Sequence, residues 1–137
     1  MPNTLDSNSL ELMKVFEQRT GAKVADVVDS ESSVVFIVEE GQIGKAIGKQ
    51  GSTLAKLREA FSPKNVEVIE DASDVRTMID KTLRGAIIRN VEQNDNHIVI
   101  SVDSTTRGIA IGKGGSNIKK LKVALKRKFG IEDTKIL

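Results

Sequence analysis

A six-residue segment occurs twice in this chain, and the repeat extends well beyond the segment itself. Residues 47–52 read Ile-Gly-Lys-Gln-Gly-Ser, and residues 111–116, which lie 64 positions later, read Ile-Gly-Lys-Gly-Gly-Ser. The same offset aligns further pairs on both sides: Gly44 with Gly108, Leu57 with Leu121, and the run 34–38 with the run 98–102. Self-similarity at one fixed offset indicates that a single structural unit is used twice. We therefore expect the 137 residues to form two small domains, over residues 1–70 and 73–137.

Each unit shows the same order of predicted elements: helix, strand, strand, helix, helix, strand. The first helix carries Leu10, Met13 and Phe16, whose spacing predicts one apolar face. In both units a short helix ends at the glycine segment, and we expect Ser52 and Ser116 to cap the helices that follow it. This order predicts an α+β fold in which each small sheet is covered on one face by helices.

The composition excludes several classes of protein. Without any cysteine, the chain cannot form disulfides or use thiol chemistry. No apolar run approaches the roughly 20 residues of a membrane span, and the N-terminus lacks a signal-peptide core, so we expect a cytoplasmic protein with no membrane partner. His97 is the only histidine and falls at a predicted turn. Because no carboxylate clusters with other ligand types, the sequence predicts no catalytic residue and no metal site.

Charge is divided unequally between the two units. Residues 1–72 contain 8 Lys and Arg against 12 Asp and Glu, whereas residues 73–137 contain 13 against 7. No acidic residue occurs between Ser104 and Ile131, a stretch that holds eight basic ones. Lysine-rich stretches are often only solvated helix faces, but the complete absence of acids beside a glycine turn favours a polyanionic partner. The split also predicts that the second unit contributes more of the affinity for that partner.

The repeated glycine segment has two interpretations. Glycine permits positive φ angles and close backbone approach, so the segment could be only a tight corner between two helices. The following helix, however, points its unpaired N–H groups and the positive end of its dipole at the same place, which suits a phosphate. Lys49 and Lys113 add a cation at the tip, and Ser52 and Ser116 add a hydroxyl where it is not used in capping. Two copies with the same lysine and serine favour the phosphate site.

The spacing of the glycines argues against a nucleotide site. The P-loop requires four residues between its first glycine and Gly-Lys, which is then followed by Ser or Thr. Here three residues separate Gly44 from Gly48, Gln50 follows the lysine, and the second copy fails in the same way. The turn also lies between two predicted helices rather than after a strand, unlike the dinucleotide-binding pattern. We therefore expect no nucleotide cofactor, no small-molecule substrate and no NTPase activity.

The residues around the two turns resemble the KH domain. Its pattern is Ile-Gly-x-x-Gly, followed by Ile or Leu three residues later and Leu three further on, and it fits residues 47–57 and 111–121. The element order is similar to that of type II, prokaryotic KH domains. Two such domains in tandem with a very short linker resemble the archaeal members of the NusA family of transcription factors. The resemblance implies an α+β fold of two type II KH domains, each α-β-β-α-α-β, packed together.

The resemblance also implies an RNA-binding site. A KH domain binds single-stranded RNA beside its Gly-x-x-Gly loop, which clamps about four backbone nucleotides. The residues implied as the clamp are Gly48, Lys49, Gln50, Gly51, Gly112, Lys113, Gly114 and Gly115, with Ser52 and Ser116 directly after them. Ile47 and Ile111 would line the floor of the groove. From charge and position alone, we add five cations to this set: Lys45, Lys56, Arg107, Lys119 and Lys120.

Together these features predict a non-catalytic regulator of transcription elongation, termination or antitermination. Its expected partners are single-stranded RNA and, as a second candidate, RNA polymerase. One alternative stays open at this point, namely a ribosome-associated or RNA-processing and assembly factor that uses the same fold on structured RNA.

Overall fold

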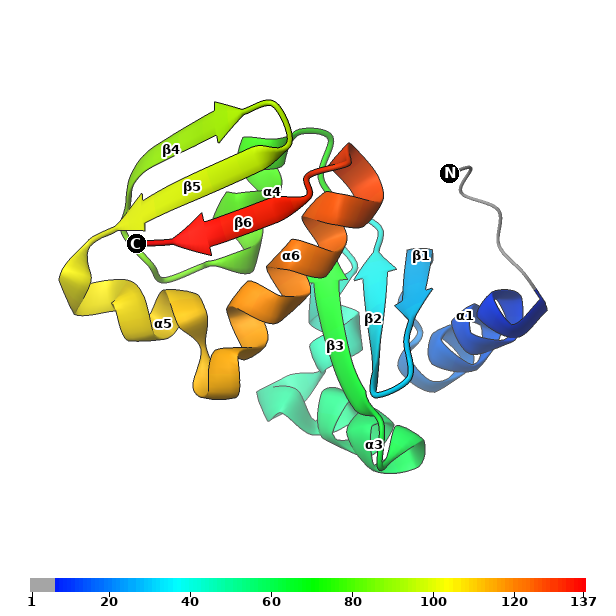
Figure 1. The fold of residues 1–137 in the computed structure, drawn as a ribbon. Coiled ribbons are helices and arrows are strands. Elements are labelled where there is room, and N and C mark those ends of the chain that lie inside the picture. Colours follow the sequence, from blue (N-terminus) through cyan, green and yellow to red (C-terminus); the bar gives the residue numbers. More distant parts are fainter. Residues whose placement is uncertain (1–6) are drawn as a thin grey trace. The chain divides into compact units, whose positions relative to one another are not determined.

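A computed structural model describes residues 7–137, and in it the chain divides into two compact units with a boundary between Asp71 and Ala72 (Figure 1). The start expected for the first domain, at residue 1, lies outside the described residues. Each unit has the element order helix, strand, strand, helix, helix, strand, which confirms the predicted α+β class. Every helix among residues 7–137 is too short or too polar to cross a lipid bilayer.

The first unit is built on a three-stranded sheet. Its elements are α1 (Ser7–Thr20), β1 (Val24–Asp29), β2 (Ser33–Val38), α2 (Ile43–Ile47), α3 (Ser52–Phe61) and β3 (Asn65–Glu70). The strand order is β1-β2-β3, and the central strand β2 is antiparallel to β1 and parallel to β3. The central place of β2 follows from its sequence, because residues 34–38 are all apolar and all buried.

The second unit repeats this topology. Its elements are α4 (Val75–Thr82), β4 (Ile88–Asn94), β5 (His97–Val102), α5 (Arg107–Ile111), α6 (Ser116–Phe129) and β6 (Asp133–Ile136). The order is β4-β5-β6, and β5 is antiparallel to β4 and parallel to β6. Helix α4 begins at an N-cap, Asp74, whose carboxylate accepts a 2.8 Å hydrogen bond from the Thr77 amide. This hydrogen bond holds the pKa of Asp74 below its ordinary value.

Aromatic side chains form the centre of the first core. Phe16 of α1 and Phe36 of β2 are fully buried and stack with their ring centroids 4.2 Å apart. Phe61 of α3 approaches Phe36 at 5.9 Å, so three elements meet at one side chain. The prediction for Leu10 was wrong, because Leu10 is 55% exposed and Leu12 packs against the core instead. Leu10 is six residues from Phe16, so the helical rotation places it about 120° away from Phe16 around the helix axis. Leu12 is four residues from Phe16 and therefore lies on the same face.

The second core is aliphatic. Its central residues come from α4 and the residue that follows it, from β5 and from α6, and all are at most 1% exposed: Met78, Ile79, Leu83, Ile98, Ile100, Leu121 and Leu125. The two buried isoleucines alternate along β5, as expected for one face of a strand. Helix α6 ends at Gly130, which takes a left-handed conformation with φ 72°. The core thereby fixes the long helix that follows the second glycine turn.

We expect the substitution Phe36→Ala to destabilise the first unit by about 3–5 kcal/mol, because it removes a fully buried ring that contacts two other aromatic side chains. Urea unfolding monitored by circular dichroism measures this loss. Leu10→Ala is the matched control and is expected to change the free energy of unfolding by less than about 0.5 kcal/mol. An effect of Leu10→Ala as large as that of Phe36→Ala would contradict this assignment of the core.

Candidate nucleic-acid interface

The two glycine segments adopt the same backbone path. Helix α2 ends at Gly48, residues 49–51 form a single turn, and α3 begins at Ser52. In the second unit α5 ends at Gly112, residues 113–115 form the turn, and α6 begins at Ser116. Each segment is thus a tight helix-turn-helix corner whose tip carries a lysine.

The first glycine of each turn is required for steric reasons. Gly48 has φ 76° and ψ 174°, and Gly112 has φ 80° and ψ 168°, a region that is essentially open only to glycine. A Cβ atom on Gly48 would lie 2.2 Å from Oγ1 of Thr53, and one on Gly112 would lie 2.8 Å from the amide nitrogen of Asn117. The backbone at the end of the short helix therefore rests directly against the first turn of the next helix.

The residue after the lysine, Gln50 in one copy and Gly114 in the other, shows that the two turns share a conformation although this residue differs. Gln50 has φ 55° and Gly114 has φ 64°, so both are left-handed. A Cβ atom on Gly114 would meet no other atom within 4 Å, so the space there admits a side chain. Gln50 is one of the two described residues other than glycine with a positive φ, a conformation that is uncommon for residues other than glycine. The strain at Gln50 supports a role for the turn beyond simple connection.

The predicted serine caps are wrong. The N-cap positions of α3 and α6 are Gly51 and Gly115, which are both left-handed and have no side chain that could cap the helix. Ser52 and Ser116 are the first residues inside the helices. Their amides donate to the carbonyls of Lys49 and Lys113, so the first amide of each helix is already bonded within the turn.

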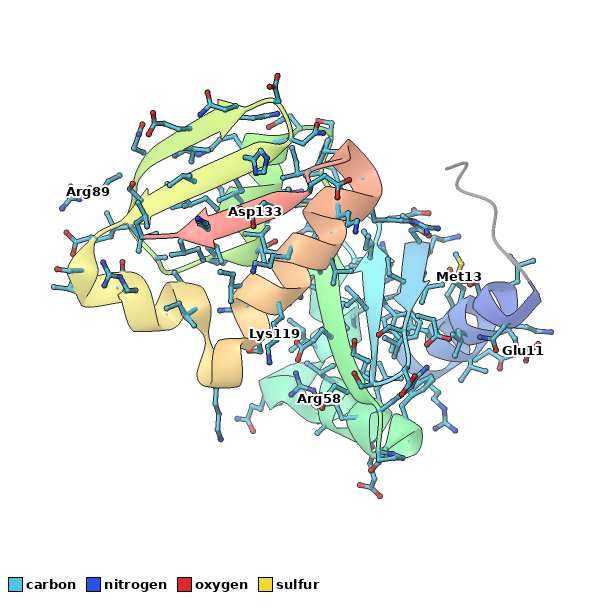
Figure 2. All side chains as sticks on the ribbon, in the orientation of Figure 1. Glu11, Met13, Arg58, Arg89, Lys119 and Asp133 are labelled. Atoms are coloured by element: carbon cyan, nitrogen blue, oxygen red, sulfur yellow. The ribbon has the colours of Figure 1, made fainter. Side chains whose placement is uncertain are left out.

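The cations chosen from the sequence surround these turns. Lys45 lies on α2, Lys56 on α3 and Arg107 at the start of α5, while Lys49 and Lys113 are the first residues of the turns. Lys119 lies on α6 with its Cε atom 3.6 Å from the position of a Cβ atom on Gly115, and Figure 2 shows it projecting from the first half of that helix. Lys120 is half-buried and already interacts within the protein.

These cations are not neutralised locally. Several other basic side chains form ion pairs: Arg58 with Glu67, Lys64 with Asp29, Arg76 with Asp80, and Lys126 with Glu132. Among residues 7–137, no ion pair involves the exposed cations of the turns and their flanking helices, which are Lys45, Lys49, Lys56, Arg107, Lys113 and Lys119. Positive charge near the turns is therefore available to an anionic ligand.

An apolar residue precedes each turn. Ile47 closes α2 and is 38% exposed, while Ile111 closes α5 and is half-buried. The alanine before each of them, Ala46 or Ala110, is fully buried and anchors the short helix to its core. The structure thus places an aliphatic side chain directly before each lysine-bearing turn.

Sequence reasoning missed the residues that hold the turns in shape. Asn117 donates a 2.8 Å hydrogen bond from Nδ2 to the carbonyl oxygen of Ile109, which joins α6 back to α5 across the turn. Thr53 occupies the equivalent position in the first unit, against Gly48. The 64-residue offset pairs these two polar residues, and that pairing was the available signal.

Metal ligands are not grouped in the described part of the chain. Among residues 7–137, no three His, Asp or Glu residues are placed to hold one ion. Nδ1 of His97 lies 3.7 Å from Oδ2 of Asp133, where the paired strands β5 and β6 begin.

Comparison with known proteins shows similarity to a domain family, to a curated protein and to a solved structure. The KH domain model matches twice, over residues 11–73 and 74–137. Probable transcription termination protein NusA of Halobacterium salinarum is 32% identical over 135 residues, covering 96% of this chain and 96% of that protein. The solved structure of APE1850 is 34% identical with a TM-score of 0.79, covering 96% of this chain and 99% of the other.

A shorter similarity involves a ribosomal protein. Small ribosomal subunit protein uS3 of Chloroflexus aurantiacus is 42% identical over 59 residues, which are 42% of this chain and 24% of that protein. The matched length is about that of a single unit.

We expect Gly112→Ala to destabilise the second unit by about 2 kcal/mol or more, because the methyl group meets the Asn117 backbone and the conformation is closed to alanine. Gly108→Ala is the matched control four residues earlier, where φ is not positive and no atom lies within 4 Å of the added Cβ. It is expected to stabilise by up to about 1 kcal/mol. Thermal and urea unfolding of both variants measure the difference, and equal stabilities would refute the steric account.

Proposed function

Because this chain belongs to the KH-domain proteins and, among them, to the NusA family, we propose that it binds single-stranded RNA and regulates transcription elongation or termination without catalysis. The proposal rests on one observation above all. Two turns of the same backbone path each place exposed, unpaired cations and a neighbouring aliphatic side chain at the start of a helix. Cations at the positive end of a helix dipole suit phosphate, and the aliphatic side chain suits a base.

Each residue of the proposed site has a chemical role. The turns Gly48–Gly51 and Gly112–Gly115 approach the sugar–phosphate backbone closely, because their glycines leave the surface bare. Lys49, Gln50, Lys113 and the serines Ser52 and Ser116 provide donors to phosphate oxygens. Ile47 and Ile111 contact base faces. Charge neutralisation of further phosphates is assigned to Lys45, Lys56, Arg107, Lys119 and Lys120.

Stacking on aromatic rings contributes little to this mode of binding. The chain has no Trp and no Tyr. Phe16 and Phe36 are fully buried, and Phe61 packs against the same core. RNA-binding folds that stack bases on exposed sheet aromatics therefore offer no model for this protein. Affinity is expected to depend on phosphate contacts and so to fall with salt.

RNA polymerase is the proposed protein partner, and the cytoplasm is the proposed location of this protein. The similarity to uS3 over the length of a single unit keeps a ribosome-associated role as the second candidate. Affinity purification of the tagged chain at low salt separates the two. Recovery of RNA polymerase subunits supports the transcription role, whereas recovery of ribosomal particles supports the second candidate.

We expect the double substitution Lys113→Asp, Gly114→Asp to weaken RNA binding by at least about tenfold, since it replaces a phosphate contact with two like charges facing phosphate. Fluorescence anisotropy with a labelled single-stranded RNA measures the loss. The matched control is Gly114→Gln, which copies the residue that the first unit carries at φ 55° and is expected to bind normally. If the double variant binds RNA as tightly as the parent, the assignment of the turn is wrong.

The two units are expected to contribute unequally to binding. Replacing Lys113 and Lys119 with alanine should make the dependence of the RNA association constant on salt less steep. The slope of log K against log salt concentration should become less negative by about 0.7 for each lost phosphate contact. Alanine at Lys45 and Lys49 should lower affinity less, because the first unit has an excess of acidic residues. Salt titrations of both double variants test this, and a larger loss from the first unit would contradict it.

A further inference from the structure

The edge strand of the second unit begins beside the helix that leads into the glycine turn. The amide of Asp103 donates a 2.8 Å hydrogen bond to the carbonyl of Ile87, and the amide of Ile87 donates a 3.0 Å bond to Oγ1 of Thr106. A Cβ atom on Gly85 would lie 3.5 Å from a methyl carbon of Ile109 on α5. Ile87 is 48% exposed and Ile109 is 49% exposed. Two accessible aliphatic side chains thus flank one corner, next to the segment that leads into Gly112.

A β-bulge places an arginine at the same corner. Along β4, Ile88 pairs with Val102 and Asn90 pairs with Ser101, so Arg89 between them has no partner residue on β5. A bulge of this kind redirects its side chain away from the regular alternation of the strand. Figure 2 shows Arg89 projecting outward from the edge of the sheet.

The redirected side chain is held by a carboxylate. Nη2 of Arg89 lies 2.6 Å from Oδ1 of Asp103, at the end of the neighbouring strand. Asp103 also accepts hydrogen bonds from the hydroxyl and the amide of Thr105. The Thr105 hydroxyl and then Arg89 lower the pKa of Asp103 to about 2, so this carboxylate is ionised throughout the neutral range. One end of the guanidinium is thereby fixed while the side chain stays 64% exposed.

The first unit has the same backbone scaffold with different side chains. There the amide of Glu39 donates to the Lys23 carbonyl at 2.9 Å, and the Lys23 amide donates to Oε1 of Gln42 at 3.0 Å. Its strand β1 carries a bulge at the matching position, which is occupied by Ala25. The positions of Ile87 and Ile109 are taken by Lys23 and Lys45. Only the second unit combines two aliphatic side chains with an anchored guanidinium on this scaffold.

We infer that Ile87, Arg89 and Ile109 form a base-reading surface for one unstacked nucleotide of the RNA gripped by Gly112–Gly115, an inference that rests on the proposed function. The isoleucines contact the face of the base, and the free edge of the Arg89 guanidinium donates two parallel N–H bonds to its rim. Two adjacent acceptors are needed opposite this fork. Guanine offers them at O6 and N7 and cytosine at O2 and N3, whereas neither adenine nor uracil has two adjacent acceptors.

The matching surface of the first unit binds without reading the base. Lys23 and Lys45 are compact point charges on flexible stems and suit phosphate oxygens, and Ala25 offers no hydrogen bond. The two units thus divide recognition, with base selection assigned to the second unit and backbone attachment shared by both.

Fluorescence anisotropy at one fixed salt concentration tests this surface. The probes are labelled RNAs of about ten nucleotides, long enough for the roughly four that a KH loop clamps: an oligoadenylate, and the same oligomer with a central run of uracil, cytosine or guanine. We expect the parent protein to bind the cytosine or the guanine oligomer about fivefold or more tightly than the adenine and uracil oligomers.

The decisive variant is Arg89→Lys, which keeps the charge and loses the planar fork. It is expected to bind oligoadenylate within about twofold of the parent while its preference for cytosine or guanine disappears. Circular dichroism confirms that this exposed substitution leaves the fold intact. Lys23→Ala is the matched control in the first unit and should weaken binding to all four oligomers by the same factor.

The outcomes separate this inference from the proposed function. If the parent shows no preference, or if Arg89→Lys keeps it, the base-reading surface is overturned while RNA binding through the turns stands. If the parent binds none of the oligomers, the proposed function falls as well. Loss of preference in Arg89→Lys alone supports both.

Discussion

The contact between the end of one helix and the start of the next, made possible by a glycine without a side chain, determines how each unit presents its lysine-bearing turn. At Gly48 and Gly112 there is no room for a single additional carbon, because Thr53 and Asn117 occupy that space. This close approach fixes the direction of α3 and α6 relative to the short helices before them. It also places an exposed lysine at the tip of each turn. The arrangement of the turn is thus a consequence of packing.

Buried residues anchor the helices on either side of each turn to the core of its unit. The short helices are anchored by Ala46 and Ala110, and the long helix α6 is anchored by Leu121 and Leu125. Each of these residues is fully buried, so the turn is mounted on rigid elements rather than on a mobile loop. Rigid mounting matters for a phosphate clamp, because hydrogen-bond donors that are already in place lose little entropy on binding.

Duplication allowed the two units to keep one scaffold and change its chemistry. The backbone hydrogen bonds beside α2 and α5 are the same in both, and so is the bulge in the edge strand. Side chains at these positions are not constrained by the core, since they point to solvent. Selection could therefore place Ala25 and Lys23 on one copy, and Arg89 and Ile87 on the other, without cost to the fold.

Local sequence signals were sufficient for the fold and for the turns. The 64-residue repeat, the apolar runs and the glycines predicted the element order and the place of the two glycine turns. They failed where a contact or an orientation had to be resolved more finely than a pattern allows. Leu10 lies off the buried face because of the rotation of about 100° per residue along the helix. Ser52 and Ser116 do not cap because the glycines directly before them occupy the N-cap positions in a left-handed conformation.

The sequence by itself thus determined that there are two α+β units, each with a glycine turn between two helices, because spacing along the chain is enough to specify helices, strands and glycine corners. Only the tertiary structure decided that Arg89 meets Asp103, 14 residues away, and that Ile87 lies beside the segment leading to the second turn. Those contacts depend on strand register and on one unpaired residue in a bulge. A bulge shifts the register by a single residue, and the alternation of apolar and polar residues in one short strand does not reveal it.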